Sequence, residues 1–124
     1  MKFIAAPSAA SPTGPYFPAV LADNLLFVSG QIPLAADGSL AGEDIATQTR
    51  QVFANLKDLL AQVEAGLANV VKTTVFLTDL NDFAAMNAIY AEAFGAHRPA
   101  RSTVQVAKLP RDARVEIEAI AVLD

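Results

Sequence analysis

The last quarter of the chain, residues 98–123, constrains the fold more than any other stretch. It contains two runs typical of β-strands, 101–107 and 113–123, separated by a short segment with Pro110. In the second run, apolar residues alternate with Glu116 and Glu118, which is the pattern of a strand with one buried face. We therefore expect the two runs to pair as an antiparallel hairpin.

The first of these strands carries an arginine in an otherwise apolar and neutral pattern. Arg101, Thr103 and Gln105 share one face of the strand. An arginine placed in this way needs a partner, either a carboxylate of the protein or an anionic ligand. The other basic residues nearby are interpreted as solvated residues of the hairpin tip: Lys108, Arg111 and Arg114.

Composition limits the class of protein. The 124 residues predict one domain, 1–124, with a single core. Charged residues make up only 18% of the chain, against about 25% in an average domain, which favours an apolar surface buried against another subunit. The formal net charge of -4 argues against general nucleic-acid binding.

Several kinds of site are also excluded or made improbable by composition. The chain has no cysteine, so disulfides and thiolate chemistry are absent. Its one histidine, His97, cannot build a multi-histidine metal site, and we predict that it lies in a surface loop. No secretory signal and no apolar run of about 20 residues is visible, so we expect a cytoplasmic protein without a membrane partner.

The first third of the chain predicts an edge and a hairpin. A short edge strand is expected around Phe3, followed by a proline-rich loop that ends in Thr13-Gly-Pro-Tyr16. Asp23-Asn24 is a turn signal between two apolar runs, the second of which is the strand 25–31. Ser29-Gly30-Gln31 interrupts that strand, which indicates a bulge or the close approach of another group, for example a ligand.

Two helices are predicted after a further turn at Asp37-Gly38. The first spans 44–65, with Asp44 as its cap, Gly66 as its end and one apolar stripe that should cover a sheet. The strand 69–77 follows, and then a helix over 82–94. On this helix Asn87 interrupts an apolar stripe, so its amide needs a backbone, water or ligand partner.

The order of elements predicts an α+β fold: a mixed β-sheet with two helices packed on one face. No helix remains to cover the other face of the sheet. We therefore expect the protein to be a homo-oligomer, in which a second subunit covers that face.

The polar residues that suit the binding of a small carboxylate are Tyr16, Ser29, Asn87, Arg101, Thr103 and Glu116. Arg101 can supply a bidentate anchor that lysine cannot copy. The expected hairpin puts Glu116 opposite about Gln105 and roughly 13 Å from Arg101 along the strand. A ligand that touches both residues is therefore expected to lie between two subunits. Tyr16 and Asn87 also have purely structural interpretations, packing over the sheet edge and bonding a loop backbone.

Several motifs, taken together and in order, resemble those of the Rid family, the reactive intermediate deaminases, also called the YjgF family. They are GPY at 14–16, FVSGQIP at 27–33, VKTTVFLTD at 71–79, DF at 82–83 with Asn87 and Tyr90, PARS at 99–102, LP at 109–110 and VEIEAIA at 115–121. The resemblance covers nearly the whole chain. It implies a chorismate-mutase-like subunit, homotrimeric, with ligand clefts between subunits.

The resemblance also implies an activity. Better-known members hydrolyse enamines and imines, such as 2-aminoacrylate and 2-iminobutanoate, to 2-keto acids and ammonia without a cofactor or metal. By position, Arg101 would hold the substrate carboxylate, the backbone beside Thr103 the imine nitrogen, and Glu116 the attacking water. The same resemblance puts three further residues in the cleft: Tyr16, Ser29 and Asn87.

The chain departs from the family pattern at three places. Phe17-Pro18 stands where a smaller polar pair is usual, Thr103 replaces a common cysteine, and the loop 95–98 is short. Some members of the family lack deaminase activity. Alternatives to a deaminase are therefore a keto-acid-binding regulator without turnover, a chaperone-like interaction protein, and, against the net charge, a ribonuclease.

Overall fold

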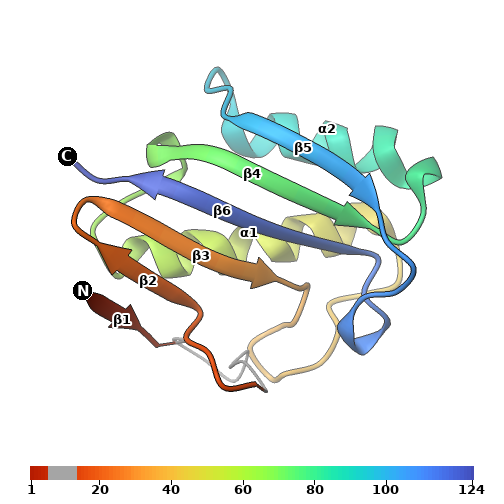
Figure 1. Ribbon diagram of the computed structural model, residues 1–124. Coiled ribbons are helices and arrows are strands. Elements are labelled where there is room, and N and C mark those ends of the chain that lie inside the picture. The colour runs from red at the N-terminus through yellow and green to blue at the C-terminus, as the bar shows by residue number, and fades with distance from the viewer. Residues whose placement is uncertain (6–13) are drawn as a thin grey trace.

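The computed structural model describes residues 1–5 and 14–124, and it has a six-stranded mixed sheet with two helices on one face (Figure 1). The elements are β1 (Lys2–Ile4), β2 (Ala19–Ala22), β3 (Leu25–Gln31), α1 (Ile45–Ala61), β4 (Val70–Leu77), α2 (Phe83–Phe94), β5 (Ala100–Gln105) and β6 (Val115–Val122). The strand order is β1-β2-β3-β6-β4-β5. The predicted α+β class and element order are confirmed. Within the described residues, no helix is long and apolar enough to span a membrane.

The N-terminal predictions are largely confirmed. β1 is an edge strand, and β2 and β3 form an antiparallel hairpin whose turn contains Asp23 with a φ of 54°. Gly38 forms the second turn with a φ of 86°. Pro7, Pro12 and Thr13, which belong to the predicted proline-rich loop, lie outside the described residues.

The helix α1 covers the sheet with the predicted stripe. Its carboxylate cap is Asp44, which accepts a hydrogen bond from the backbone N–H of Thr47 at 2.9 Å. Val52, Leu56 and Leu60 are completely buried, so the stripe forms the centre of the core. The predicted C-terminal end is wrong: the helix ends at Ala61, and Glu64 takes the left-handed conformation expected of a glycine.

The predicted C-terminal hairpin is wrong. β6 pairs with β3 and β4, while β5 pairs with β4 alone and runs parallel to it, so β4 separates the two expected partners. The burial of the strands gives the physical reason. Val115, Ile117 and every second residue to Ala121 are buried in β6, whereas no residue of β5 is fully buried. The strand with the more apolar buried face therefore takes an internal position, and β5 becomes the edge.

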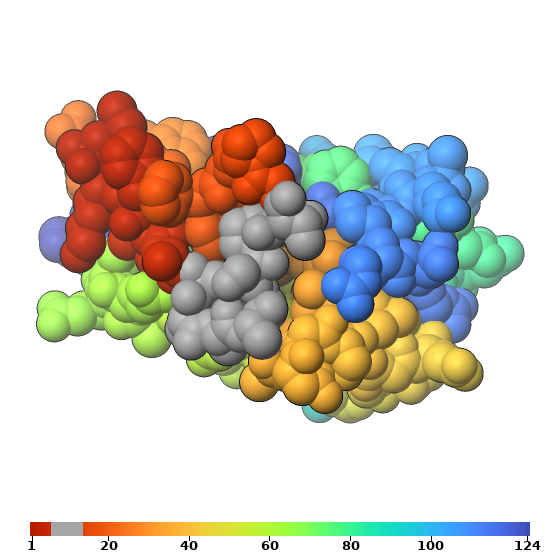
Figure 2. Space-filling view, turned by 90° about the horizontal axis from the view of Figure 1, so that it is seen from below, coloured from red at the N-terminus to blue at the C-terminus, as the bar shows by residue number. Residues whose placement is uncertain are grey.

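The segment between β5 and β6 is held by arginines that the sequence interpretation left in solvent. Arg114 donates from Nη2 and Nε to the carboxylate of Asp82, at 2.8 and 3.2 Å, and from Nη1 to the carbonyl of Glu43. Arg111 donates to the carbonyl of Gly38. Figure 2 shows the consequence, since the segments around residues 35–45 and 106–114 lie side by side on the surface. Lys108, which pairs with Asp112, and Arg111 are exposed as predicted, whereas Arg114 is half-buried.

The ion pair of Asp82 and Arg114 is expected to stabilise the fold. Asp82→Ala should lower the free energy of unfolding by about 2 kcal/mol, because it leaves a partly buried guanidinium without its acceptor. The side chain of Asp82 caps no helix, so the destabilisation reports the ion pair. Urea denaturation followed by circular dichroism measures it. Lys108→Ala, which removes an ion pair with side chains 78% and 82% exposed, should cost less than about 0.5 kcal/mol. Equal destabilisation of the two variants would contradict this account.

The face of the sheet opposite the helices carries exposed apolar side chains, as predicted. Phe27 is 44% exposed and Val104 is 42% exposed on this face. A hollow of ≈ 410 Å³ lies over β2, β3, β6 and β4, and its polar walls are the side chains of Ser29, Lys72, Thr74 and Glu118. A face of this kind is typical of an interface between subunits.

Candidate functional site

Arg101 lies on β5 and turns its side chain toward α2. Its Nη1 donates to Oδ1 of Asn87 at 2.7 Å. Its Cζ lies 4.6 Å from the ring centroid of Tyr90 and 5.5 Å from that of Phe83. These distances are within the range of cation–π contacts. The guanidinium is therefore held by an amide and two aromatic rings.

The sequence left two possible partners for Arg101, a carboxylate of the protein and an anionic ligand. None of the salt bridges among the described residues involves it, so the predicted protein carboxylate is not the partner. The bond to Asn87 uses one of its five N–H donors, and the others find no acceptor among the described side chains. The group is a fixed cation with donors left unused among the described side chains, and the second predicted partner, an anionic ligand, stays a prediction.

Asn87 sits at the margin of the apolar stripe of α2. Met86, Tyr90 and Phe94 are buried, while Asn87 is half-buried and faces β5. Its carbonyl oxygen accepts from Arg101, so the structural prediction of a loop-backbone partner is wrong. The amide nitrogen has no protein partner among the described residues and remains available to a ligand.

Thr103 follows on the same face of β5, two residues after Arg101. Its register partner is Val75 of β4, and its Oγ1 is buried without a hydrogen-bond partner among the described atoms. β5 is the edge of the sheet, so half of its backbone N–H and C=O groups point away from β4. A small ligand beside Arg101 can therefore meet free backbone groups as well as the guanidinium.

Glu116 lies at the start of β6, on the open face of the sheet. The absence of a side chain at Gly30 makes room for it, because a Cβ there would lie 2.3 Å from Oε2 of Glu116. The predicted bulge is confirmed by a register shift between Val28 and Gln31. The predicted close approach is confirmed too, and a carboxylate of the protein makes it. Burial raises the pKa of Glu116 above its ordinary value, and the nearby charge of Glu118 raises it further.

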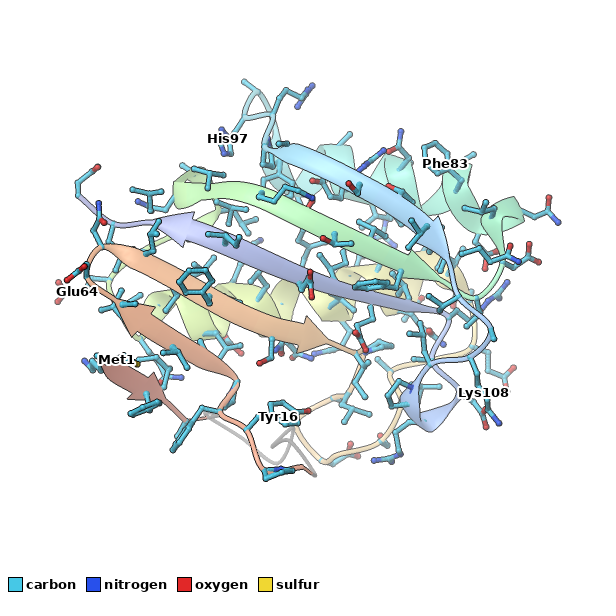
Figure 3. All side chains as sticks on the ribbon, viewed as in Figure 1. Met1, Tyr16, Glu64, Phe83, His97 and Lys108 are labelled. Carbon is cyan, nitrogen blue, oxygen red and sulfur yellow. The ribbon has the colours of Figure 1, made fainter. Side chains whose placement is uncertain are left out.

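Ser29 adjoins Gly30, which Glu116 approaches, and Tyr16 adjoins Phe17, whose carbonyl accepts a hydrogen bond from Ser29. Ser29 lines the hollow of the open face, and its hydroxyl donates to the carbonyl of Phe17 at 3.0 Å. Tyr16 is 52% exposed, so it does not pack tightly over the sheet edge. Figure 3 shows Tyr16 in the loop before β2, well separated from Phe83 at the start of α2. The six predicted residues therefore fall into two groups. One consists of Tyr16, Ser29 and Glu116, and the other of Asn87, Arg101 and Thr103.

The two groups cannot form one pocket within a single subunit. Thr73 of β4 pairs with Arg101 on one side and Ala119 on the other, while Phe76 pairs with Val104 and Glu116. Arg101 and Glu116 are therefore two strands apart and three positions apart along the strands, which corresponds to roughly 14 Å. They also point to opposite faces of the sheet. The predicted separation holds, although the predicted hairpin behind it is wrong.

Sequence interpretation missed two residues near the site and misplaced a third. Phe83 and Tyr90 contact the guanidinium, and their spacing of four and three residues from Asn87 was the available signal. His97 is half-buried rather than on the surface, and its Nε2 lies 2.6 Å from the carbonyl oxygen of Val70. It therefore ties the loop before β5 to the start of β4.

Comparisons with known proteins show the family and agree with the fold. The family model described as endoribonuclease L-PSP matches residues 6–123. A RutC family protein of Pyrococcus horikoshii is 50% identical over 92% of the chain and 91% of its own length. The 2-iminobutanoate/2-iminopropanoate deaminase of Escherichia coli K12 is 44% identical over 98% of the chain and 97% of its own length. The crystal structure of E. coli TdcF with bound serine covers 100% of both chains, with 40% identity and a TM-score of 0.94.

Proposed function

Because the chain belongs to the endoribonuclease L-PSP family, which is the family of the Rid proteins, we propose that it is a deaminase of reactive 2-enamine and 2-imine acids. It hydrolyses 2-aminoacrylate and 2-iminobutanoate to 2-keto acids and ammonia. Relatives in two species that are 44% identical over 98% of the chain carry the name 2-iminobutanoate/2-iminopropanoate deaminase. Other relatives are named only as RutC family proteins, so the choice of imine substrate is part of the proposal.

The observation that carries the proposal is the environment of the Arg101 guanidinium. A guanidinium fixed by Asn87 and Tyr90, with free donors at the edge strand, is suited to binding a carboxylate in a bidentate manner. Both proposed substrates are small acids that carry such a carboxylate next to the reacting carbon. The serine bound to TdcF is a ligand of the same size and charge type.

The site is completed between subunits of a homotrimer. Arg101 and Glu116 face opposite sides of one sheet, and the open face leaves apolar side chains such as Phe27 uncovered. A head-to-tail arrangement of three copies covers this face and brings Glu116 of one subunit to Arg101 of the next. Tyr16 and Ser29 enter the cleft with Glu116, and Asn87 and Thr103 with Arg101.

The reaction needs few catalytic groups. Arg101 holds the substrate carboxylate, and a backbone group beside Thr103 forms a hydrogen bond with the imine nitrogen. Glu116 orients a water molecule and takes its proton as the oxygen attacks C2. Glu116 passes this proton to the nitrogen, the hydroxyl group now on C2 gives up its own proton as the C–N bond breaks, and ammonia and a 2-keto acid are released. Because the iminium carbon is already electrophilic, positioning and one general base suffice. A Glu116 pKa raised by burial makes the carboxylate a stronger base.

A threonine dehydratase coupled to the purified protein tests the proposal. The protein is expected to accelerate release of 2-ketobutanoate over spontaneous hydrolysis of the imine. The structure of TdcF with bound serine favours one competing function, a binder of small acids without turnover. Calorimetric binding of 2-ketobutanoate together with no acceleration would replace the deaminase by that regulator.

A further inference from the structure

The support beneath the Arg101 guanidinium belongs to the core of the subunit. Tyr90 is only 8% exposed, and Arg101 lies over its ring at 4.6 Å. The ring is confined by two neighbours, Phe53 at 5.6 Å in an edge-on contact and Phe94 at 4.8 Å. A ring packed in this way has little freedom to tilt or slide.

The hydroxyl of Tyr90 is also fixed. It shares a buried hydrogen bond of 2.7 Å with Oγ1 of Thr73, a residue that is 0% exposed. Thr73 is also the register partner of Arg101 across β4 and β5. One residue of β4 therefore sets the position of both the backbone of Arg101 and the ring beneath its guanidinium. The three residues form a closed loop of contacts through β4, β5 and α2.

We propose that Tyr90 is a positioning residue for the arginine anchor, with Thr73 fixing the ring. The ring sets the plane of the guanidinium, and Asn87 fixes one edge of it. A long, rotamer-rich side chain thus becomes preorganised, and less freedom is lost when a carboxylate binds. The kinetic part of this inference rests on the proposed function, whereas the ordering of the guanidinium does not.

Nuclear magnetic resonance tests the ordering without any turnover. In protein labelled at arginine, with the Arg101 signal identified by its loss in Arg101→Lys, the side-chain protons should be shifted upfield by the Tyr90 ring, and the Nε–H order parameter should be high. Tyr90→Met is expected to lower both the upfield shift and the order parameter, leaving only the contribution of Phe83. Tyr90→Phe keeps the ring and most of the shift, but it loses the bond to Thr73, so its order parameter should fall between those of the wild-type protein and Tyr90→Met. An unshifted, disordered Arg101 in the wild-type protein would overturn the proposal even if Tyr90→Met failed to fold.

Phe94→Met is the matched control. Phe94 lies on the same helix and in the same aromatic cluster, and it is 7% exposed, but it has no contact with Arg101 in the structure. Both methionine variants should lose stability, and Tyr90→Met should lose more because it also breaks the buried hydrogen bond to Thr73. Tyr90→Met should raise the KM for the imine acid by about tenfold with kcat nearly unchanged. Phe94→Met removes one neighbour of the Tyr90 ring but leaves the ring and its bond to Thr73, so it should raise the KM by no more than about twofold. Tyr90→Phe should stay within about twofold of the wild-type protein.

The outcomes separate this inference from the proposed function. A wild-type protein without turnover, but with an ordered Arg101 that Tyr90→Met disorders, would reject the deaminase and keep the positioning role. Turnover in the wild-type protein with equal KM in Tyr90→Met and Phe94→Met would keep the deaminase and reject the positioning role. It would mean that Tyr90 is only a core residue.

Discussion

Arg101→Ala is expected to lower kcat/KM for imine hydrolysis by about 10²- to 10³-fold, because it removes two charge-assisted hydrogen bonds to the substrate carboxylate. Most of the decrease should appear as a higher KM, and binding of 2-ketobutanoate should weaken by a similar factor. The fold should be nearly unaffected, since within the subunit the substitution removes one hydrogen bond and two cation–π interactions. The coupled dehydratase assay and calorimetry measure the two effects.

Two variants control for charge. Arg101→Lys keeps the positive charge but not the bidentate geometry, so it should lie between the wild-type protein and the alanine variant. Arg98→Ala removes an exposed arginine three residues away and should leave kcat/KM unchanged. A full rate in Arg101→Ala would show that another group binds the carboxylate. An equal decrease in Arg98→Ala would show that overall charge matters and the position of Arg101 does not.

Glu116→Gln is expected to lower kcat by about 10²-fold or more with a small change in KM, because an amide cannot take the proton of the attacking water. In the wild-type protein, kcat/KM should rise with pH through the pKa of Glu116, which burial places above its ordinary value of 4.5. This rise should be absent from any residual activity of the glutamine variant. A pH–rate profile of both proteins provides the comparison.

Glu116→Gln is also expected to raise the stability of the fold, although it lowers kcat. A carboxyl group whose pKa is raised by folding binds its proton more tightly in the folded state. The free energy of unfolding therefore falls as the pH rises from the ordinary pKa of 4.5 to the raised pKa of Glu116. Glutamine removes this dependence, so Glu116→Gln should be more stable than the wild-type protein at pH 7. Lower stability of the variant at pH 7 would contradict the account of its environment.

Glu118→Gln is the control for the Glu116 variant. Glu118 is exposed on the same face of β6, and its charge contributes to the raised pKa of Glu116. Its replacement should leave the maximal rate unchanged and move the acid limb of the profile to lower pH. An unchanged midpoint would mean that burial alone sets the pKa of Glu116.

The face on which each residue lies was predictable, and the neighbour of each strand was not. The alternation around Glu116 and Glu118 gave the correct buried face of β6. Periodicity says nothing about which strand lies alongside, because pairing depends on burial summed over the whole sheet. One signal against a hairpin of β5 and β6 was available. Residues 106–114 make a longer connection than the roughly two to five residues of a typical hairpin loop.

The candidate site shows the same division between local and distant information. The spacing of Phe83, Asn87 and Tyr90 placed them on one helix face, and a β4-α2-β5 unit brings that face to Arg101. The contact of Glu116 with Gly30 joins distant parts of the chain. The only sequence signal for it was a glycine within a predicted strand. The uncovered face was predictable because both helices were expected on one face of the sheet, which left no helix for the other.

The most direct measurement of the central claim mixes two inactive variants. Arg101→Ala and Glu116→Gln are unfolded together, refolded at equal amounts and assayed for 2-ketobutanoate release. If each site takes Arg101 from one subunit and Glu116 from the next, random assembly restores both residues at about a quarter of the sites, and about a quarter of the wild-type activity returns. If both residues served a site within one subunit, every site would lack one of them. The mixture would then stay as inactive as its components.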